Sequence, residues 1–250
     1  MDNEFKLSGI VIGAVDYKEK DKLITIFSLE LGKITAKLVG VKNKNAKLKW
    51  ASQIFCFAEF MLVRRGEFYT VIGASQIESF YDLTADYSKF LIGQALVEML
   101  NVATQPVTIS EKLFIETAKA LNVLTYSDSV CNLVVLTKYI LILLQFGGYG
   151  IDFDNCNHCK NKLFNVICFD KNLGELTCGP CANNYSQEIS KKTYNFLKLI
   201  NSTEVASMAS IKIKDEDLFE IVPLLCYNFE DKFGKKNVFC LFLKLISKNY

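Results

Sequence analysis

The sequence contains a single histidine in 250 residues and lacks the short motifs around which the common enzyme classes are built. It has no G-x-x-x-x-G-K-[ST] phosphate loop, no G-x-G-x-x-G dinucleotide fingerprint and no G-x-S-x-G nucleophile elbow. With His158 alone, a histidine-based catalytic triad or a histidine-rich metal centre is excluded. We therefore expect that the protein is not an enzyme.

Long apolar runs are also missing. Residues 133–146 form the longest stretch, but Lys138 and Gln145 interrupt it, and a membrane-spanning helix needs ~20 apolar residues. This stretch therefore predicts a buried helix, and no membrane is expected among the partners of the protein. Residues 1–9 are charged and have no apolar segment, so no signal peptide is expected. The nine cysteines are then expected in a reducing, cytoplasmic compartment, where paired cysteines usually indicate metal binding or catalysis.

Arginine is nearly absent, because Arg64 and Arg65 are the only two in the chain. Lysine carries almost all of the positive charge, and the formal net charge is only +2. The overall balance therefore says little about partners, and only local clusters of charge are informative. Half of the residues are hydrophobic, which is enough for a well-packed core.

Residues 1–80 have the pattern of a small β-barrel. Five short runs rich in Val, Ile, Phe and Thr alternate with Gly, Asn and Lys, which predicts five strands in a closed or partly open barrel. Helical spacing follows at residues 87–104, with Asp82, Thr84 and Asp86 as candidate start signals.

Further helices are expected beyond this point. Ser110 is a candidate N-cap for a helix that ends at Leu124, and Asp128 or Ser129 opens another that ends at Gly147-Gly148. Helical spacing resumes at residues 190–202, at 215–233, where Pro223 interrupts it, and at 235–248. The expected fold class is α+β, a barrel followed by a helical domain with an inserted cysteine-rich loop.

Four cysteines form two C-x-x-C pairs, Cys156/Cys159 and Cys178/Cys181, with 18 residues between the pairs. This spacing is typical of a zinc site in which each pair supplies two thiolates of a tetrahedron. Four thiolates leave no open position for water, so one structural Zn²⁺ is expected. The residues 165–169 and 174–178 are expected to form two short strands that lead into the second pair.

The other candidates near this site have simpler interpretations. His158 lies within the first pair and is expected on its surface, while Cys168 lies between two apolar residues and is expected to pack in a strand. The remaining cysteines lie in apolar runs and are expected in the core: Cys56, Cys131, Cys226 and Cys240. An alternative is a thiol oxidoreductase that uses Cys156/Cys159, which requires an exposed thiol of low pKa.

A basic segment runs from Leu31 to Ala58 without any acidic residue. Clustered lysines bind phosphate backbones with little sequence preference, and barrels of the OB type hold nucleic acid on one face and its adjoining loops. The alternative is a solvated loop, and Trp50 is expected to plug the barrel. The acidic residues Asp16, Glu19 and Asp21 lie among lysines, so a solvated hairpin is preferred there to a metal site.

Taken together, these features resemble the RecO family of DNA-repair and recombination mediators. The resemblance begins in the first strands, at Tyr17, Glu19, Asp21, Leu23, Thr25, Phe27, Gly32 and Lys33. It continues through residues 96–100 and through Gly148, Tyr149, Cys156 and Cys159, so it covers the whole chain in order.

The resemblance implies an OB-fold barrel at 1–80, a helical domain at 81–154 and 186–250, and a zinc loop at 155–185. It implies binding of single- and double-stranded DNA, annealing of complementary strands without ATP, and partnership with RecR and with the C-terminal tail of single-stranded DNA-binding protein. It also implies that the protein helps indirectly to load RecA onto DNA. The protein would be bacterial and associated with the nucleoid. By analogy, the expected phosphate contacts are Lys33, Lys37, Lys42, Lys44, Lys47, Lys49, Arg64 and Arg65. A zinc-containing adaptor that binds proteins but does not anneal DNA is the alternative.

Overall fold

A computed structural model describes residues 4–65, 68–127 and 132–234 of the chain, except for the side chains of residues 65 and 68. The chain divides into two compact units, Met1–Thr125 and Tyr126–Tyr250. The first unit contains the expected barrel and two helices, and the second contains further helices and the cysteine-rich segment. The expected domain limits at 80, 154 and 185 stay predictions.

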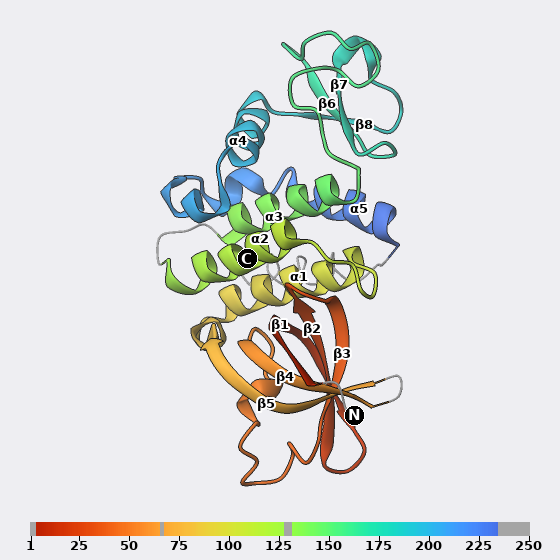
Figure 1. The fold of residues 1–250 in the computed structure, drawn as a ribbon. Coiled ribbons are helices and arrows are strands. Elements are labelled where there is room, and N and C mark those ends of the chain that lie inside the picture. The colour runs from red at the N-terminus through yellow and green to blue at the C-terminus, as the bar shows by residue number, and fades with distance from the viewer. Residues whose placement is uncertain (1–3, 66–67, 128–131, 235–250) are drawn as a thin grey trace. The chain divides into compact units, whose positions relative to one another are not determined.

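Five strands close into a barrel in the first unit (Figure 1). The order around the barrel is β1-β2-β3-β5-β4, and every pair is antiparallel except β3 with β5. This OB-like barrel confirms the predicted fold class. Its strands are β1 (Glu4–Tyr17), β2 (Asp21–Ser28), β3 (Gly32–Leu38), β4 (Phe57–Arg65) and β5 (Phe68–Glu78).

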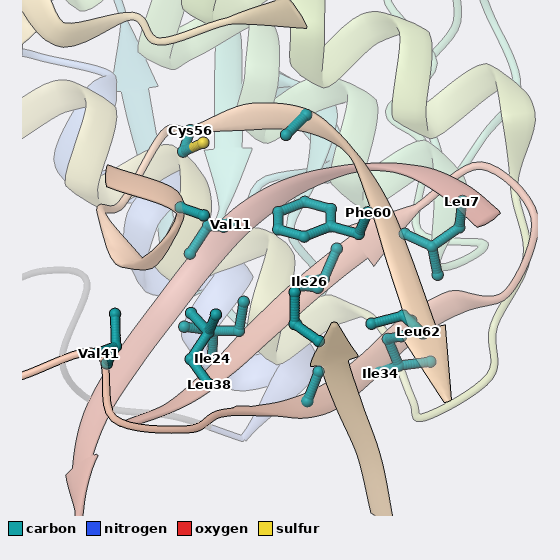
Figure 2. Packing of buried hydrophobic residues seen from close by; sticks show 14 residues of the cluster. Leu7, Val11, Ile24, Ile26, Ile34, Leu38, Val41, Cys56, Phe60 and Leu62 are labelled. Atoms are coloured by element: carbon teal, nitrogen blue, oxygen red, sulfur yellow. The ribbon is translucent and has the colours of Figure 1, made fainter. Parts of the chain in front are cut away.

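The barrel interior is filled by alternate residues of each strand, as the two-residue period of a strand requires. Figure 2 shows this core, to which Ile24, Ile26, Phe60 and Leu62 contribute fully buried side chains. Trp50 is partly buried and packs against the same core, as predicted.

Two helices complete the first unit. Helix α1 (Tyr87–Ala103) begins after Asp86, whose side chain accepts a hydrogen bond from the Lys89 N–H. Helix α2 (Glu111–Tyr126) begins after Ser110, whose hydroxyl accepts from the Leu113 N–H. Both caps satisfy donors that a helix start leaves unpaired, and both were predicted.

In the second unit, α3 (Asn132–Phe146) contacts both α4 (Lys191–Ser202) and α5 (Val222–Phe233). Helix α3 ends at the predicted glycine pair. The Ser190 hydroxyl caps α4, and Pro223 lies in the first turn of α5, where its missing N–H costs nothing. The predicted helix starts at 128 and 129, the helix at 235–248, and Cys131 and Cys240 lie outside the described residues.

A three-stranded antiparallel sheet with the order β7-β6-β8 lies between α3 and α4 in the sequence (Figure 1). Strands β6 (Ile167–Asp170) and β7 (Glu175–Cys178) were predicted, and β8 (Ser186–Ile189) was not. Short 3-10 helices complete the described chain: η1 (Trp50–Ser52), η2 (Tyr81–Ala85), η3 (Gly179–Cys181), η4 (Val205–Ser210) and η5 (Asp215–Leu218). No helix in the described ranges is long and apolar enough to cross a membrane.

The turn between β6 and β7 packs against α5 through Gly174. Its backbone has a φ of +74°, and a Cβ at this position would lie 2.0 Å from Asn228 Oδ1. The Asn228 side-chain amide donates to the Gly174 carbonyl oxygen at 3.2 Å. Only glycine therefore allows both the left-handed turn and the close approach of α5.

We predict that Gly174→Ala lowers the free energy of unfolding by about 2 kcal/mol or more, since strain in the left-handed region and a steric clash add together. Gly148→Ala is the matched control. Gly148 has a φ of +84°, but among the described residues no atom beyond its chain neighbours lies within 4 Å of the added Cβ. It should cost about 1 kcal/mol. Urea denaturation of both variants measures the difference, and equal losses would show that the contact with Asn228 is unimportant.

Candidate metal centre and nucleic-acid interface

The four predicted cysteines meet at one point. The sulfur atoms of Cys156, Cys159, Cys178 and Cys181 all lie within 4.8 Å of one another, and those of Cys159 and Cys178 are 3.8 Å apart. A tetrahedral zinc ion with Zn–S bonds of ~2.3 Å places its sulfurs about 3.8 Å apart. The donor set and the spacing therefore fit one zinc ion.

Local hydrogen bonds shape the two turns that carry these sulfurs. The Cys156 N–H donates to the Asn161 carbonyl oxygen at 2.7 Å, and the Lys160 N–H donates back to the Cys156 carbonyl oxygen at 2.9 Å. The Cys178 N–H points at the sulfur of Cys156, 3.4 Å away. Strand β7 thus delivers the second pair directly to the first turn.

The protein environment favours one thiolate and disfavours others. Burial opposes ionisation of Cys156, but the backbone N–H groups of Cys159, Cys178 and His158 lower the pKa of its thiol to about 6. The hydrogen bond to Cys178, followed by burial, raises the pKa of the Cys181 thiol to about 12. A bound cation lowers the pKa even of the thiols whose pKa the protein raises, because coordination deprotonates thiols.

The neighbouring residues lie where the sequence placed them. His158 is exposed and is not among the clustered ligands, and Cys168 is buried within β6. Cys56 and Cys226 are buried in the core, and burial raises the pKa of both thiols to about 12. Among the described residues the four cysteines are the only such group of ligands, so Asp16, Glu19 and Asp21 form no comparable cluster.

The geometry also bears on the oxidoreductase alternative. A thiol nucleophile must be exposed as well as ionised. Cys156 has the lowered pKa but is fully buried. Cys159 is exposed, but its sulfur lies close to those of Cys178 and Cys181 as well as to that of Cys156, whereas a redox pair consists of two sulfurs alone. The four sulfurs lie as the ligands of a closed four-thiolate metal site would lie.

The basic segment between β3 and β4 forms a long loop, residues 39–56. Lys42, Lys44, Lys47 and Lys49 are all exposed on it. Hydrogen bonds along the loop, such as Ala46 N–H to Asn43 O at 3.2 Å, fold it into successive turns. The structure therefore gathers four of the eight predicted phosphate contacts on one loop.

Comparison with known protein families bears on both features. Residues 1–80 match the family Recombination protein O N terminal, and residues 84–236 match Recombination protein O C terminal. The second match alone covers more than half of the chain. The chain belongs to the RecO family. The predicted resemblance is confirmed.

Curated RecO-family relatives match along nearly their whole length. A DNA repair protein RecO from Clostridium perfringens is 27% identical over 240 residues, which are 96% of this chain and 97% of the relative. A protein of the same name from Acetivibrio thermocellus is 28% identical over 224 residues, 88% of each chain.

In this RecO-family chain, the predicted phosphate contacts Lys33, Lys37 and Lys42 have hydrogen-bond or ion-pair partners within the barrel unit. The ammonium group of Lys33 donates to the carbonyl oxygen of Asn101 at 2.6 Å and to that of Thr104, at the C-terminal end of α1. Lys37 pairs with Asp21 at 2.8 Å, and Lys42 pairs with Asp16 at 2.7 Å. The sequence pattern did not reveal these contacts, because the partners are distant along the chain.

The two acidic partners are held as carboxylates. The hydrogen bond from Lys37, followed by that from the Gly40 N–H, lowers the pKa of Asp21, and the hydrogen bond from Lys42 lowers the pKa of Asp16. Asp21 is buried rather than solvated, which corrects part of the predicted solvated hairpin, while Asp16 and Glu19 are exposed.

The two arginines lie at the end of β4. Arg64 is exposed, and its guanidinium lies 6.0 Å from the centre of the Tyr69 ring. The backbone of Arg65 belongs to the same strand, and its side chain lies outside the described part of the chain. The two arginines therefore lie on a strand and not on the loop that carries the four exposed lysines.

We predict that Cys178→Ser lowers zinc content and stability together, because metal binding and folding of such loops are coupled. Cys168→Ser is the control, since it changes a nearby buried cysteine outside the cluster. Elemental analysis after purification without chelator, followed by urea denaturation, measures both quantities. A wild-type protein without metal, or a Cys178→Ser variant that retains it, would contradict the zinc site.

We predict that Lys33→Met lowers the free energy of unfolding by about 1–3 kcal/mol, because it leaves two carbonyl oxygens without their charged donor. Lys44→Met should change stability by less than about 0.5 kcal/mol. Chemical denaturation compares the two variants. If Lys33→Met proves as stable as the wild type but weakens DNA binding, Lys33 contacts phosphate instead of stabilising the barrel unit.

Proposed function

We propose that this chain is a DNA repair and recombination mediator that binds single- and double-stranded DNA and anneals complementary strands without ATP. The observation that carries the proposal is the loop with Lys44, Lys47 and Lys49. These lysines are exposed, and none has an ion-pair partner among the residues that the structure describes. The names of the relatives, DNA repair protein RecO, support the same class of function.

Annealing follows from charge neutralisation in this proposal. Two DNA strands repel each other, and lysines that bind their phosphates displace counterions and hold the strands together long enough to pair. The proposed phosphate contacts begin with Lys44, Lys47 and Lys49, whose charges are available, and extend to Lys42 and Arg64 at the edges. No step needs a catalytic residue.

The zinc site has a structural part in the proposal. Cys156, Cys159, Cys178 and Cys181 hold one Zn²⁺, which ties the end of β7 to the turn that carries the first cysteine pair. We further propose that the second unit contacts protein partners: RecR, and the C-terminal tail of the single-stranded DNA-binding protein that coats the strands. Through these contacts the chain would help to load RecA in the bacterial cytoplasm, close to the nucleoid.

We predict that the triple variant Lys44→Gln, Lys47→Gln and Lys49→Gln anneals complementary oligonucleotides at least about ten-fold more slowly than the wild type at low salt. Its affinity for single strands should also depend less steeply on salt, since each lost phosphate contact removes ~0.7 from the slope of log K against log salt. Stopped-flow fluorescence of labelled strands measures annealing, and titration at several salt concentrations measures the slope.

The matched control removes the same charge elsewhere, with Lys112→Gln, Lys191→Gln and Lys212→Gln, all of them exposed. Equal loss in both triple variants would mean that net charge matters and the loop does not. Annealing should be measured on bare strands and on strands coated with single-stranded DNA-binding protein. Acceleration on bare strands alone would remove the partner contact from the proposal, and no acceleration at all would favour the adaptor.

A further inference from the structure

A β-bulge in β1 determines which side chains face outward near the tip of the β1–β2 hairpin. The register against β2 shifts between Val11 and Gly13. Val11 points into the core, and beyond the bulge Ala14 packs against the core. Val15 and Tyr17 therefore face outward, whereas an unbroken alternation from Val11 would turn both inward.

The pairing register shows what surrounds these two residues. Val15 pairs with Leu23, which pairs with Lys37, and Thr25 pairs with Thr35. Directly paired residues of neighbouring strands lie on the same side of a sheet. Tyr17 pairs with Asp21, which is itself buried. The outward side of β1, β2 and β3 near the hairpin, called the open face below, thus consists of Val15, Tyr17, Asp21, Leu23, Thr25, Thr35 and Lys37.

The same side of the sheet is covered farther along β2. Phe27, two residues beyond Thr25, is fully buried, and its ring lies 6.1 Å from that of Phe114 in α2. On the open face, in contrast, Val15 is 62% exposed and Tyr17 is 37% exposed. Helix α2 therefore covers the end of this surface that carries Phe27, whereas the end that carries Val15 and Tyr17 is accessible among the residues that the structure describes.

Two lysine ammonium groups lie over the Tyr17 ring. The ammonium group of Lys37 lies 5.4 Å from the ring centre and that of Lys18 lies 5.5 Å from it. Lys37 is itself fixed by its ion pair with Asp21, which also accepts the Gly40 N–H at 2.8 Å. Asp21 is buried and its carboxylate is paired with Lys37. On the same hairpin Asp16 is exposed and pairs with Lys42, and Glu19 is exposed.

The loop of residues 39–56, which carries Lys44, Lys47 and Lys49 and is called the lysine loop below, is hydrogen-bonded to the β1–β2 hairpin. The Lys42 N–H donates to the Lys20 carbonyl oxygen at 3.0 Å, and the Lys42 side chain pairs with Asp16. A strand whose phosphates lie on the loop thus passes next to the open face. A single strand presents flat unpaired bases there, whereas in a duplex the bases are stacked and paired.

We propose that Tyr17 is a stacking platform for unpaired bases of single-stranded DNA and that the open face gives the protein a base-dependent preference for single strands. This inference rests on the proposed function and adds a second kind of contact to it. Aromatic side chains stack on every base with little sequence preference. A base that stacks here displaces the Lys18 ammonium, whose contact with the ring is weak at an exposed site, and Lys37 stays in place.

The test compares oligothymidylate with a strand of equal length in which every base is absent but every phosphate is kept. The wild type should bind oligothymidylate about ten-fold more tightly. Tyr17→Ala should lose most of this ratio and Tyr17→Phe should retain it, since the ring stacks and the hydroxyl does not. Fluorescence anisotropy at fixed salt measures the affinities, and urea denaturation verifies that both variants are folded.

The lysine-loop triple variant separates this inference from the proposed function. It should weaken binding of both strands by a similar factor and leave their ratio unchanged. Equal affinity of the wild type for both strands, or a ratio that Tyr17→Ala does not alter, would overturn the stacking platform and leave the phosphate contacts standing. A wild type that binds neither strand would overturn both proposals.

Discussion

Closure of the barrel is the constraint on which the first unit depends. Strands β3 and β5 are joined by parallel pairing at Ala36 with Tyr69 and at Lys37 with Thr70, and this short ladder turns an open sheet into a ring. A closed ring has no free strand edge and forces each strand to divide its side chains between the core and the outside. The outer side then becomes available for helices and, in our proposal, for DNA.

Much of this arrangement could be predicted because it follows from local patterns. The two-residue period marked the strands, Asp86 and Ser110 marked helix starts, and the spacing of Cys156, Cys159, Cys178 and Cys181 marked one cluster. Each of these signals lies within a few residues, or uses spacings that one ligand geometry selects.

The remainder depended on contacts between distant residues. The sequence does not distinguish a lysine in β3 that donates to the C-terminal end of α1 from an exposed lysine that could bind phosphate. Lys33 and Lys44 could therefore not be told apart. Asp21 in β2 is buried by its contacts with Lys37 in β3 and with the Gly40 N–H just after β3, both of which are distant in the sequence. Strand β8 is only four residues long and pairs with β6 across an intervening hairpin, so its own composition gave no signal.

The position of the cysteine-rich segment has a consequence for the order of folding. All four sulfurs come from the short span between Cys156 and Cys181, whereas α3 must find α4 and α5 across the whole of that segment. Loops that close locally form early and at low entropic cost. A segment that has already folded brings the end of α3 and the start of α4 closer together during synthesis. In our proposal that zinc holds this segment, the supply of zinc in the cell therefore affects how fast the helices assemble.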